Sequence, residues 1–298
     1  MNFFEFLDKL KGNYNSIILY SLLNRIPVIV LGEDSDKIDE FLIELSDLIH
    51  FRKEYVFYTD FISKSDYESL LSNENLDYNY HRAHIRCPCS VSIKALYQFD
   101  NLHSWIIGLV FPQQKSEMIH LKKLIKSKMN RILYITIAAN KISLEIEGFN
   151  LKSIDLTFEQ NIFKKITQDT EKSINKMKRV LSDKITHNQL DKDLLKTLLD
   201  FQVEKGELKK NIFKREIQNF YSASKRAFFI LSRLNLLNNV GIKTRVGSKT
   251  LLETIDYDEV PIERIISFIN KQWGDDYSDL IEDGKKAFMG DKIVSLWG

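Results

Sequence analysis

Short apolar runs alternate with amphipathic stretches over the first 140 residues. Residues 35–49 and 116–130 place apolar side chains three or four positions apart, the spacing of one helix face. A period-two segment at 141–151 predicts an edge strand or a hairpin arm. Strands alternating with helices predict an α/β domain with a largely parallel sheet covered by helices. The predicted strands are short, β-branched and bounded by turn residues, and they span residues 26–32, 54–61, 103–112 and 131–139.

Helical spacing prevails beyond residue 152, with one strand-like interruption at 241–255. This change of pattern predicts a domain boundary near residues 150–155. The sequence therefore predicts an α/β domain followed by a mainly α-helical part. Its segments are an α/β domain at 1–152, a helical linker at 153–190, a helical domain closed by a hairpin at 191–255, and an acidic helical C-terminal extension at 256–298.

The turn after the first predicted strand contains a glycine and a lysine that are five residues apart. Gly32 ends the strand, and Lys37 follows five residues later, just inside the next predicted helix. This order resembles the P-loop NTPase superfamily, in particular its AAA+ and RecA-like branches, over about 140 residues. The resemblance implies that backbone amides after Gly32 and the ammonium of Lys37 hold the phosphates of a nucleotide.

The same turn departs from the superfamily pattern at two positions. Asp36 replaces the second glycine, and Ile38 replaces the Ser or Thr that binds magnesium. The strand at 103–112 also ends in Phe-Pro rather than in an acidic pair. We therefore expect a degenerate nucleotide site, with a weakly active NTPase as an alternative. Five carboxylates would repel a triphosphate: Glu33, Asp34, Asp36, Asp39 and Glu40.

Both cysteines and two of the six histidines gather in one nine-residue stretch. Structural zinc sites usually join two well-separated ligand pairs, whereas these four residues are crowded and interspersed with Arg82 and Arg86. The pattern favours an ordinary, partly buried loop over a zinc site, and a catalytic thiolate is the other alternative. No other cofactor is predicted. The four candidate ligands are His81, His84, Cys87 and Cys89.

The charges of the chain are strongly segregated. Residues 1–120 carry a net charge of −6, residues 121–250 a net charge of +14, and residues 251–298 a net charge of −6. A basic middle segment predicts a surface that faces a polyanion. The alternative is a set of solvated helix faces in a lysine-rich protein.

Three predicted helices between residues 191 and 237 precede a predicted β-hairpin at 241–255, which turns at Gly247-Ser248. This order resembles the winged-helix branch of the helix-turn-helix class. The resemblance implies that the third helix, residues 222–237, enters the major groove of DNA while the hairpin contacts the backbone. Serines and basic side chains suit such contacts. The candidate DNA-binding residues are Ser222, Ser224, Lys225, Arg226, Arg233, Lys243, Arg245, Lys249, Lys214 and Arg215.

Composition and the motifs together favour one class of function. The lack of a long apolar run, the acidic N-terminus and the presence of only two cysteines favour a cytoplasmic protein without a membrane partner. We expect a non-enzymatic protein that binds double-stranded DNA in replication, segregation or transcription, with an inactive ATPase-like domain for assembly. The domain order resembles non-hydrolysing relatives of AAA+ initiator and clamp-loader proteins.

Two further possibilities stay open at the level of sequence. The first is a protein–protein adaptor that uses the winged helix as an interaction surface. The second is self-association, or binding of a protein partner, through the N-terminal domain or through the C-terminal tail, which ends in the apolar residues Ile293, Val294, Leu296 and Trp297.

Overall fold

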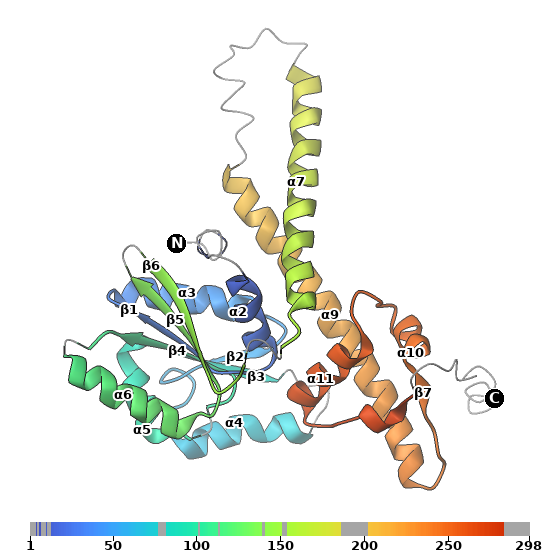
Figure 1. Ribbon diagram of the computed structural model, residues 1–298, viewed down its shortest axis with the longest axis horizontal. Helices are drawn as coiled ribbons and strands as arrows, with labels where there is room; N and C mark the ends of the chain where they lie inside the picture. Colours follow the sequence, from blue (N-terminus) through green and yellow to red (C-terminus); the bar gives the residue numbers. More distant parts are fainter. Residues whose placement is uncertain are drawn as a thin grey trace. The chain divides into compact units, whose positions relative to one another are not determined.

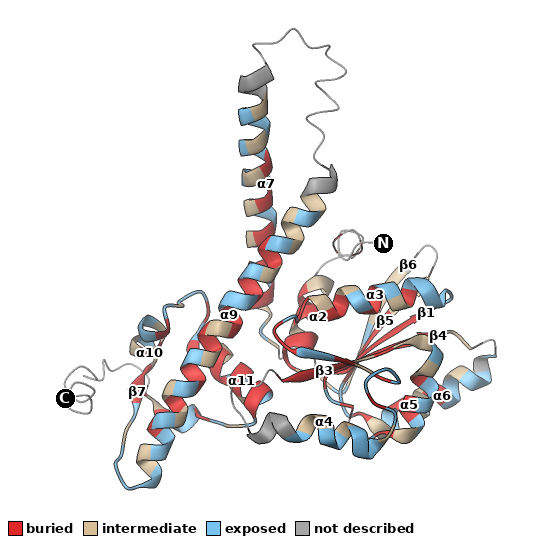
Figure 2. Ribbon diagram, turned by 180° about the vertical axis from the view of Figure 1, so that it is seen from behind, coloured by how far each residue is buried: buried red, intermediate tan, exposed pale blue. Residues whose placement is uncertain are grey.

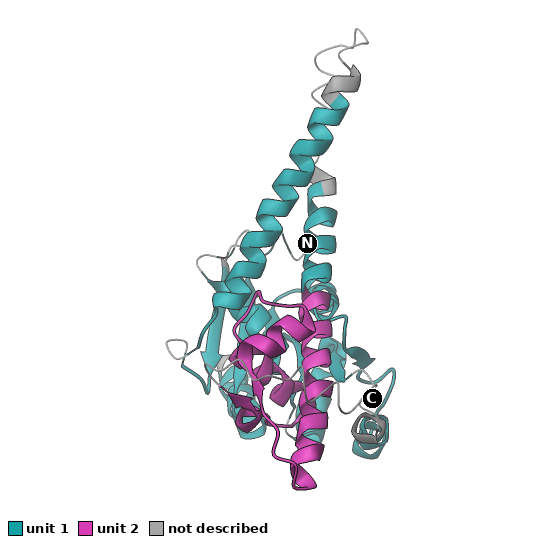
Figure 3. Cartoon of the chain, turned by 90° about the vertical axis from the view of Figure 1, so that its right-hand side faces the viewer, with its two compact units in different colours: residues 1–216 teal, residues 217–298 magenta. Residues whose placement is uncertain are grey.

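The chain forms two compact units in a computed structural model (Figure 1). The first unit comprises residues 1–216 and the second residues 217–298, coloured separately in Figure 3. This division lies well after the boundary expected at 150–155, because the helical residues 157–185 and 202–216 pack within the first unit. The structure describes residues 4, 6, 10, 13–76, 82–100, 102–112, 114–138, 141–150, 154–185 and 202–282.

A six-stranded, mostly parallel sheet is the centre of the first unit, which confirms the predicted α/β class. The strand order is β2-β3-β4-β1-β5-β6, so that β1 lies between β4 and β5, and only β6 is antiparallel to its neighbour. The strands are β1 Val28–Gly32, β2 Lys53–Val56, β3 Ala83–Cys87, β4 Trp105–Val110, β5 Ile132–Ala138 and β6 Lys141–Glu147.

Helices cover this sheet and bury its apolar side chains (Figure 2). Helix α3 directs Ile38, Phe41, Leu42 and Leu45 inward, which is the spacing expected from sequence. A cluster of aromatic rings closes the region near β2 and β4, where Phe99 lies 5.3 Å from Trp105 between ring centroids. The helices are α2 Tyr14–Leu23, α3 Ser35–Asp47, α4 Lys64–Leu76, α5 Ser92–Gln98 and α6 Lys115–Lys128.

Strand β3 replaces the loop that the sequence predicted around the histidines and cysteines, so that prediction is wrong. Ala83, Ile85 and Cys87 are buried and belong to the sheet core, while His84 and Arg86 project from the opposite face. The alternation of a strand is present in this stretch, but its polar residues conceal it. By contrast, the predicted edge strand is confirmed as β6, which ends before Gly148.

Two long helices follow the sheet. Helix α7 spans Thr157–Ile185, and α9 spans Gln202–Asn239. Within the first unit they contact each other through Phe163 and Phe213, whose ring centroids are 5.9 Å apart. The two helices predicted at 211–220 and 222–237 are one continuous element, because buried apolar residues keep helical spacing through Ile217, Phe220 and Ala223, with no helix breaker between them.

The second unit combines the end of α9 with shorter elements. These are β7 Val246–Gly247, α10 Ser248–Ile255, α11 Ile262–Trp273, the 3-10 turn η3 Ser278–Leu280 and β8 Ile281–Glu282, with β7 and β8 parallel. Phe228 stacks on Trp273 with ring centroids 4.7 Å apart and helps to form the core.

The hairpin predicted at 241–255 is wrong in its second arm. Gly247 is the residue that precedes a helix rather than a hairpin corner, and α10 buries Leu251 and Ile255, which lie four residues apart. The described residues therefore do not confirm a winged helix. Across the described ranges, no helix is both long and apolar enough to cross a membrane.

Candidate functional site

The turn between β1 and α3 is closed by one carboxylate. Asp34 is the N-cap of α3, and its Oδ1 accepts hydrogen bonds from the backbone amides of Asp36, at 3.1 Å, and Lys37, at 3.2 Å. Its Oδ2 lies 2.9 Å from Nζ of Lys37. Backbone amides at a helix N-terminus and a lysine are the groups that a phosphate loop offers to its ligand. Here Asp34 engages them within the chain.

The electrostatics of this turn follow from the same contacts. The hydrogen bond from the Lys37 side chain, with those from backbone amides, holds the pKa of Asp34 below its usual value. The same bond to Asp34 raises the pKa of Lys37. The pair is thus ionised and mutually neutralised at neutral pH. A phosphate would have to displace a carboxylate that is already in place.

The position that should bind magnesium lies in the apolar core. The Ile38 side chain is 1% exposed and packs against two glycines. A Cβ atom added to Gly32 would lie 3.2 Å from Ile38 and 3.0 Å from the carbonyl oxygen of Ile137 in β5. A side chain at this position would therefore crowd the strand end, which favours glycine. An isoleucine here supplies no oxygen ligand for a metal ion.

Side chains also fill the space next to the neighbouring strand β4. A Cβ atom added to Gly108 in β4 would lie 2.8 Å from Sγ of Cys89 and 3.0 Å from Ile38. The Asp39 carboxylate in α3 accepts a hydrogen bond from the backbone amide of Cys89 at 2.9 Å. Ligands of α/β proteins bind outside the carboxyl ends of the strands. In this chain, these contacts tie α3 to the turn after β3 at that place.

Of the four candidate zinc ligands, the three that the structure describes do not form a metal site. His84 and Cys87 are three positions apart on β3 and so project to opposite faces of the sheet. Burial, with the nearby charges of Arg52 and Arg86, lowers the pKa of His84 to about 3. His81 lies outside the described residues. Among those that are described, no group of three or more His, Cys, Asp or Glu residues could hold a metal ion.

The two thiols are poorly suited to nucleophilic chemistry. Burial, followed by the charge of Asp39, raises the pKa of Cys89 to about 12. Burial also raises the pKa of Cys87 far above its usual value. Since the thiolate is the reactive form, both side chains are protonated and unreactive at neutral pH.

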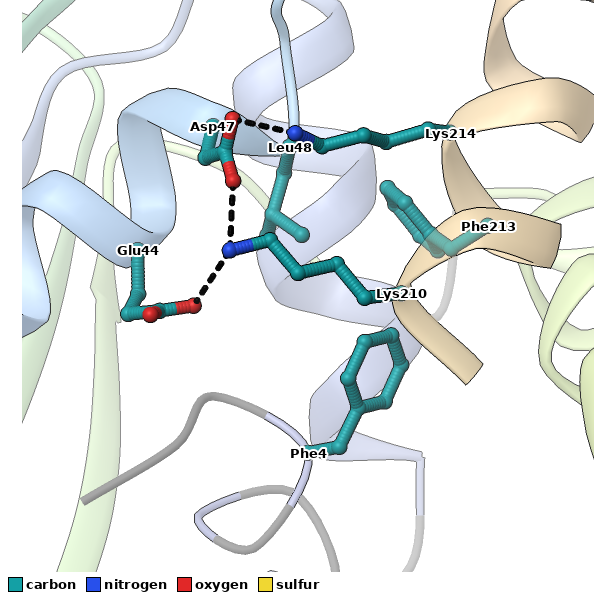
Figure 4. A pocket seen from close by; sticks show the side chains of 7 residues that line it. All are labelled: Phe4, Glu44, Asp47, Leu48, Lys210, Phe213 and Lys214. Carbon is teal, nitrogen blue, oxygen red and sulfur yellow. Dashed lines mark hydrogen bonds and ion pairs between the residues drawn. The ribbon is translucent and has the colours of Figure 1, made fainter. Parts of the chain in front are cut away.

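Several of the predicted DNA-binding cations are engaged in ion pairs. Lys214 lies 2.7 Å from a carboxylate oxygen of Asp47 in α3 (Figure 4), and Arg215 lies 3.3 Å from Glu216. In α10, Lys249 lies 3.7 Å from Glu253. The pairing with Asp47 uses a second lysine, Lys210, at 2.7 Å, which itself lies 3.6 Å from Glu44. The sequence pattern did not reveal this cluster, whose partners are far apart along the chain.

Other predicted residues serve the packing of α9. Ser224 is fully buried, and the Arg226 guanidinium donates hydrogen bonds to the carbonyl oxygen of Ile255 at the end of α10. Ser222 accepts a hydrogen bond from Gln218, and the Lys225 ammonium lies 5.9 Å from the centroid of the Phe229 ring. These contacts give each of the four side chains a partner within the chain.

Three predicted cations remain: Arg233, Lys243 and Arg245. Each is exposed and makes no ion pair with a described residue. Lys243 and Arg245 flank Thr244, whose backbone amide and Oγ1 donate hydrogen bonds to Oδ1 of Asn238, at 2.5 and 3.2 Å, respectively. This network folds residues 241–245 back along the end of α9, a feature that the hairpin prediction missed.

An open groove of about 750 Å³ accompanies this fold-back. The Asn238 amide also donates to the carbonyl oxygen of Thr244 at 3.1 Å, which fixes one wall of the groove. Cations, amides and carboxylates therefore line the same groove. Its lining residues are Asn235, Asn238, Lys243, Thr244, Arg245, Asp279, Leu280 and Glu282.

Comparison of the chain with protein-family models, with curated proteins and with solved structures gave no match. The geometry of the described residues is therefore the basis for any functional assignment.

Proposed function

We propose that this chain is a non-enzymatic protein that binds double-stranded DNA through the second unit. The observation that carries the proposal is a separation of charge along this unit. Residues 217–250 hold six Lys and Arg residues and no Asp or Glu. Three of these cations, Arg233, Lys243 and Arg245, are exposed, and their side chains make neither an ion pair nor a hydrogen bond to another described residue. Such cations supply the phosphate contacts from which DNA affinity mainly arises.

The acidic remainder of the unit restricts where DNA can approach. Residues 251–282 hold nine Asp and Glu residues against two Lys and Arg residues. Helices α10 and α11 are consecutive, as in a helix-turn-helix, but Asp258 and Glu259 precede α11 and Glu263 lies in its first turn. These carboxylates would repel DNA phosphates. We therefore assign the contact to the end of α9 and residues 241–245 rather than to α11.

The first unit fits a role without catalysis. The contacts of Asp34 with Lys37 and the burial of Ile38 leave no ready place for a triphosphate and its magnesium ion. We propose that this P-loop-like unit mediates assembly or binding of a protein partner. The test is equilibrium binding of labelled ATP with magnesium. We expect no binding at micromolar protein, and a micromolar affinity that is lost when Lys37 is changed to Ala would contradict the assignment.

A salt titration tests the DNA proposal. Fluorescence anisotropy with a random duplex, measured from about 50 to 200 mM NaCl, should show an affinity that falls steeply with salt. The R233Q/K243Q/R245Q variant should bind more weakly, and its log–log slope should be shallower by roughly 0.9 for each lost phosphate contact.

A matched control removes three positive charges from the other unit. Lys122, Lys126 and Lys128 are already paired with Glu145, Glu147 and Asp100. Changing these three lysines to Gln should leave DNA affinity within about twofold, because they are not available to phosphate. Equal losses in both triple variants would show a nonspecific effect of net charge and would remove the end of α9 from the proposal.

A protein adaptor is the second candidate function. Phe229 and Leu236 lie seven positions apart on α9, and Val240 directly follows the helix. Their side chains are 41, 54 and 73% exposed, respectively. Ile242, just beyond the helix, is 53% exposed. Exposed apolar side chains gathered in this way are typical of protein interfaces. Negligible affinity for any duplex at about 50 mM salt would favour the adaptor over the DNA-binding protein.

A further inference from the structure

The strand β6 leaves one edge of the central sheet open. It pairs with β5 on one side and is the last strand of the sheet on the other. No hydrogen bond joins its outer edge to another described residue. Ile142, Leu144 and Ile146 share one face and are only partly buried. A seven-residue edge with an apolar face is a template for pairing with another strand.

The sequence of β6, KISLEIE, is complementary to itself when it is paired antiparallel about Leu144. In that register Leu144 lies opposite its own copy, and Ile142 lies opposite Ile146. The same register brings residue 141, a lysine in the sequence, opposite residue 147, a glutamate, and brings Ser143 opposite Glu145. Apolar residues therefore meet apolar residues and opposite charges meet, which are the cross-strand pairs that stabilise a sheet.

Neighbouring registers are worse. A slip of one residue would place Ile142 opposite Glu145 and mix the two faces. Pairing about Glu145 would place this carboxylate opposite its own copy, and like charges directly opposite are destabilising. Glu145 and Glu147 are each held by a lysine of α6, at 3.0 Å from Lys122 and 2.9 Å from Lys126. Pairing about Ser143 would also keep apolar residues opposite each other, but it pairs only residues 141–145, whereas pairing about Leu144 pairs all seven residues of β6 and is therefore favoured.

The apolar face of β6 continues an existing core. Its residues Leu144 and Ile146 pair in register with Ile135 and Leu133 of β5, both of which are fully buried. A second β6 would extend this apolar surface by three more side chains. The opposite edge of the sheet, β2, is shorter, at four residues, and its first two residues are charged and exposed. Self-pairing therefore suits β6.

We propose that two copies of this chain form a dimer in which β6 pairs antiparallel with β6 of the second copy, centred on Leu144. The sheets join across a twofold axis, and the interface is the same patch on both copies. The proposal does not depend on DNA binding or on the state of the nucleotide-like turn.

A charge exchange tests the register. Light scattering of the full chain after gel filtration at tens of micromolar should give twice the chain mass of 35.0 kDa. Glu147→Lys would place lysines opposite each other, and Lys141→Glu would place glutamates opposite each other. We expect each change to weaken the dimer by about tenfold, since two symmetric pairs become repulsive. The double variant K141E/E147K should recover the dimer, because it restores opposite charges across the axis.

A disulfide tests the centre. In Leu144→Cys, the two new thiols lie opposite each other at a distance that a disulfide can bridge. Mild oxidation should give a covalent dimer on a non-reducing gel. Ile119→Cys on α6 is the matched control, since this residue is 59% exposed and lies outside the proposed interface. It should stay monomeric on the gel. Circular dichroism of each variant checks that the chain is folded.

Three results would overturn the proposal. One is a folded wild-type chain that stays monomeric at roughly 100 μM, which would leave the edge for another protein or another segment. Another is a dimer in which the Leu144→Cys variant forms no covalent link on oxidation, which would place the second copy elsewhere. The last is a dimer that the single charge changes weaken but the double variant does not recover, which would exclude this register.

Discussion

The ammonium of Lys37 lies 2.9 Å from the carboxylate of Asp34, and the same carboxylate accepts a hydrogen bond from the backbone amide of Lys37. The Asp34 side chain thus contacts both the backbone amides and the lysine ammonium of the turn after β1. Its role is that of a helix cap, and the resemblance to a phosphate loop lies in the order of the elements rather than in a vacant anion site.

Asp34→Ala should lower the melting temperature, because the amides of Asp36 and Lys37 lose their acceptor. Asp34→Asn keeps a capping oxygen while it removes the charge, so it should lie close to the wild type. Thermal unfolding followed by circular dichroism measures both. If the Asn and Ala variants melted equally low, the ion pair with Lys37 rather than the cap would be the stabilising contact.

Ile38→Ser, which makes the turn more like the superfamily motif, should destabilise the fold by about 2–5 kcal/mol, the usual cost of emptying a buried aliphatic site. The introduced hydroxyl would be buried against Gly32 and Gly108, so ATP binding should not appear. Ile43→Ser on the same helix is the control. This side chain is 52% exposed, and its loss should change stability by only about 0.5 kcal/mol. Urea denaturation compares the two.

Asp47 should give the first unit a pH-dependent stability. Burial raises its pKa, but hydrogen bonds from Lys210 and Lys214 outweigh burial and bring the pKa below the usual 3.8. A lowered folded pKa stabilises the fold above the unfolded value, and this contribution is lost as pH falls through the folded pKa. We expect Asp47→Asn to cost about 1 kcal/mol at pH 7, and this cost should shrink as pH falls through the folded pKa of Asp47.

Urea denaturation of the wild type and Asp47→Asn at several pH values measures this difference. Glu253→Gln, which removes the exposed pair with Lys249, is the control and should cost less than about 0.5 kcal/mol at neutral pH. A difference between wild type and Asp47→Asn that stayed constant down to about pH 2 would show that the carboxylate acts by shape and not by charge.

Cys89 should react slowly with a thiol reagent at about pH 8. Its pKa of about 12, set by burial and by the charge of Asp39, leaves almost no thiolate. Labelling with a chromogenic disulfide should be at least tenfold slower in the folded chain than in urea. Asp39→Asn removes the charge and weakens the hydrogen bond to the Cys89 amide, so this variant should react faster. Fast labelling of the folded wild type would instead support the hypothesis of a catalytic thiolate.

Hydrophobic periodicity predicted most of the sheet. The runs that became β1, β4 and β5 are continuous, apolar and rich in β-branched residues, and α3 shows its buried face in the sequence. Strand β3 was missed because His84 and Arg86 alternate with its apolar residues. Polar residues of this kind suggest a loop or a ligand site rather than a buried strand. The burial of His84 comes from the neighbouring strands, which a local pattern does not contain.

In the second unit, the sequence pattern predicted a strand where the structure has a helix. Gly247-Ser248 is a favoured hairpin dipeptide, yet here it begins a helix, because Leu251 and Ile255 find an apolar core only with helical spacing. Among the predicted cations, the sequence could not show that Lys214 is engaged in an ion pair whereas Arg233 is exposed. The difference lies in Asp47, which is distant in the sequence and adjacent in the fold.

The separation of charge in the second unit also determines how its basic part responds to dissolved ions. Residues 217–250 contain six Lys and Arg residues and no Asp or Glu, so no carboxylate within the segment offsets its positive charge. Interactions between exposed charges that are more than about 10 Å apart are largely screened at about 0.1 M ionic strength. The ions of the medium therefore set the range over which this surface attracts a polyanion.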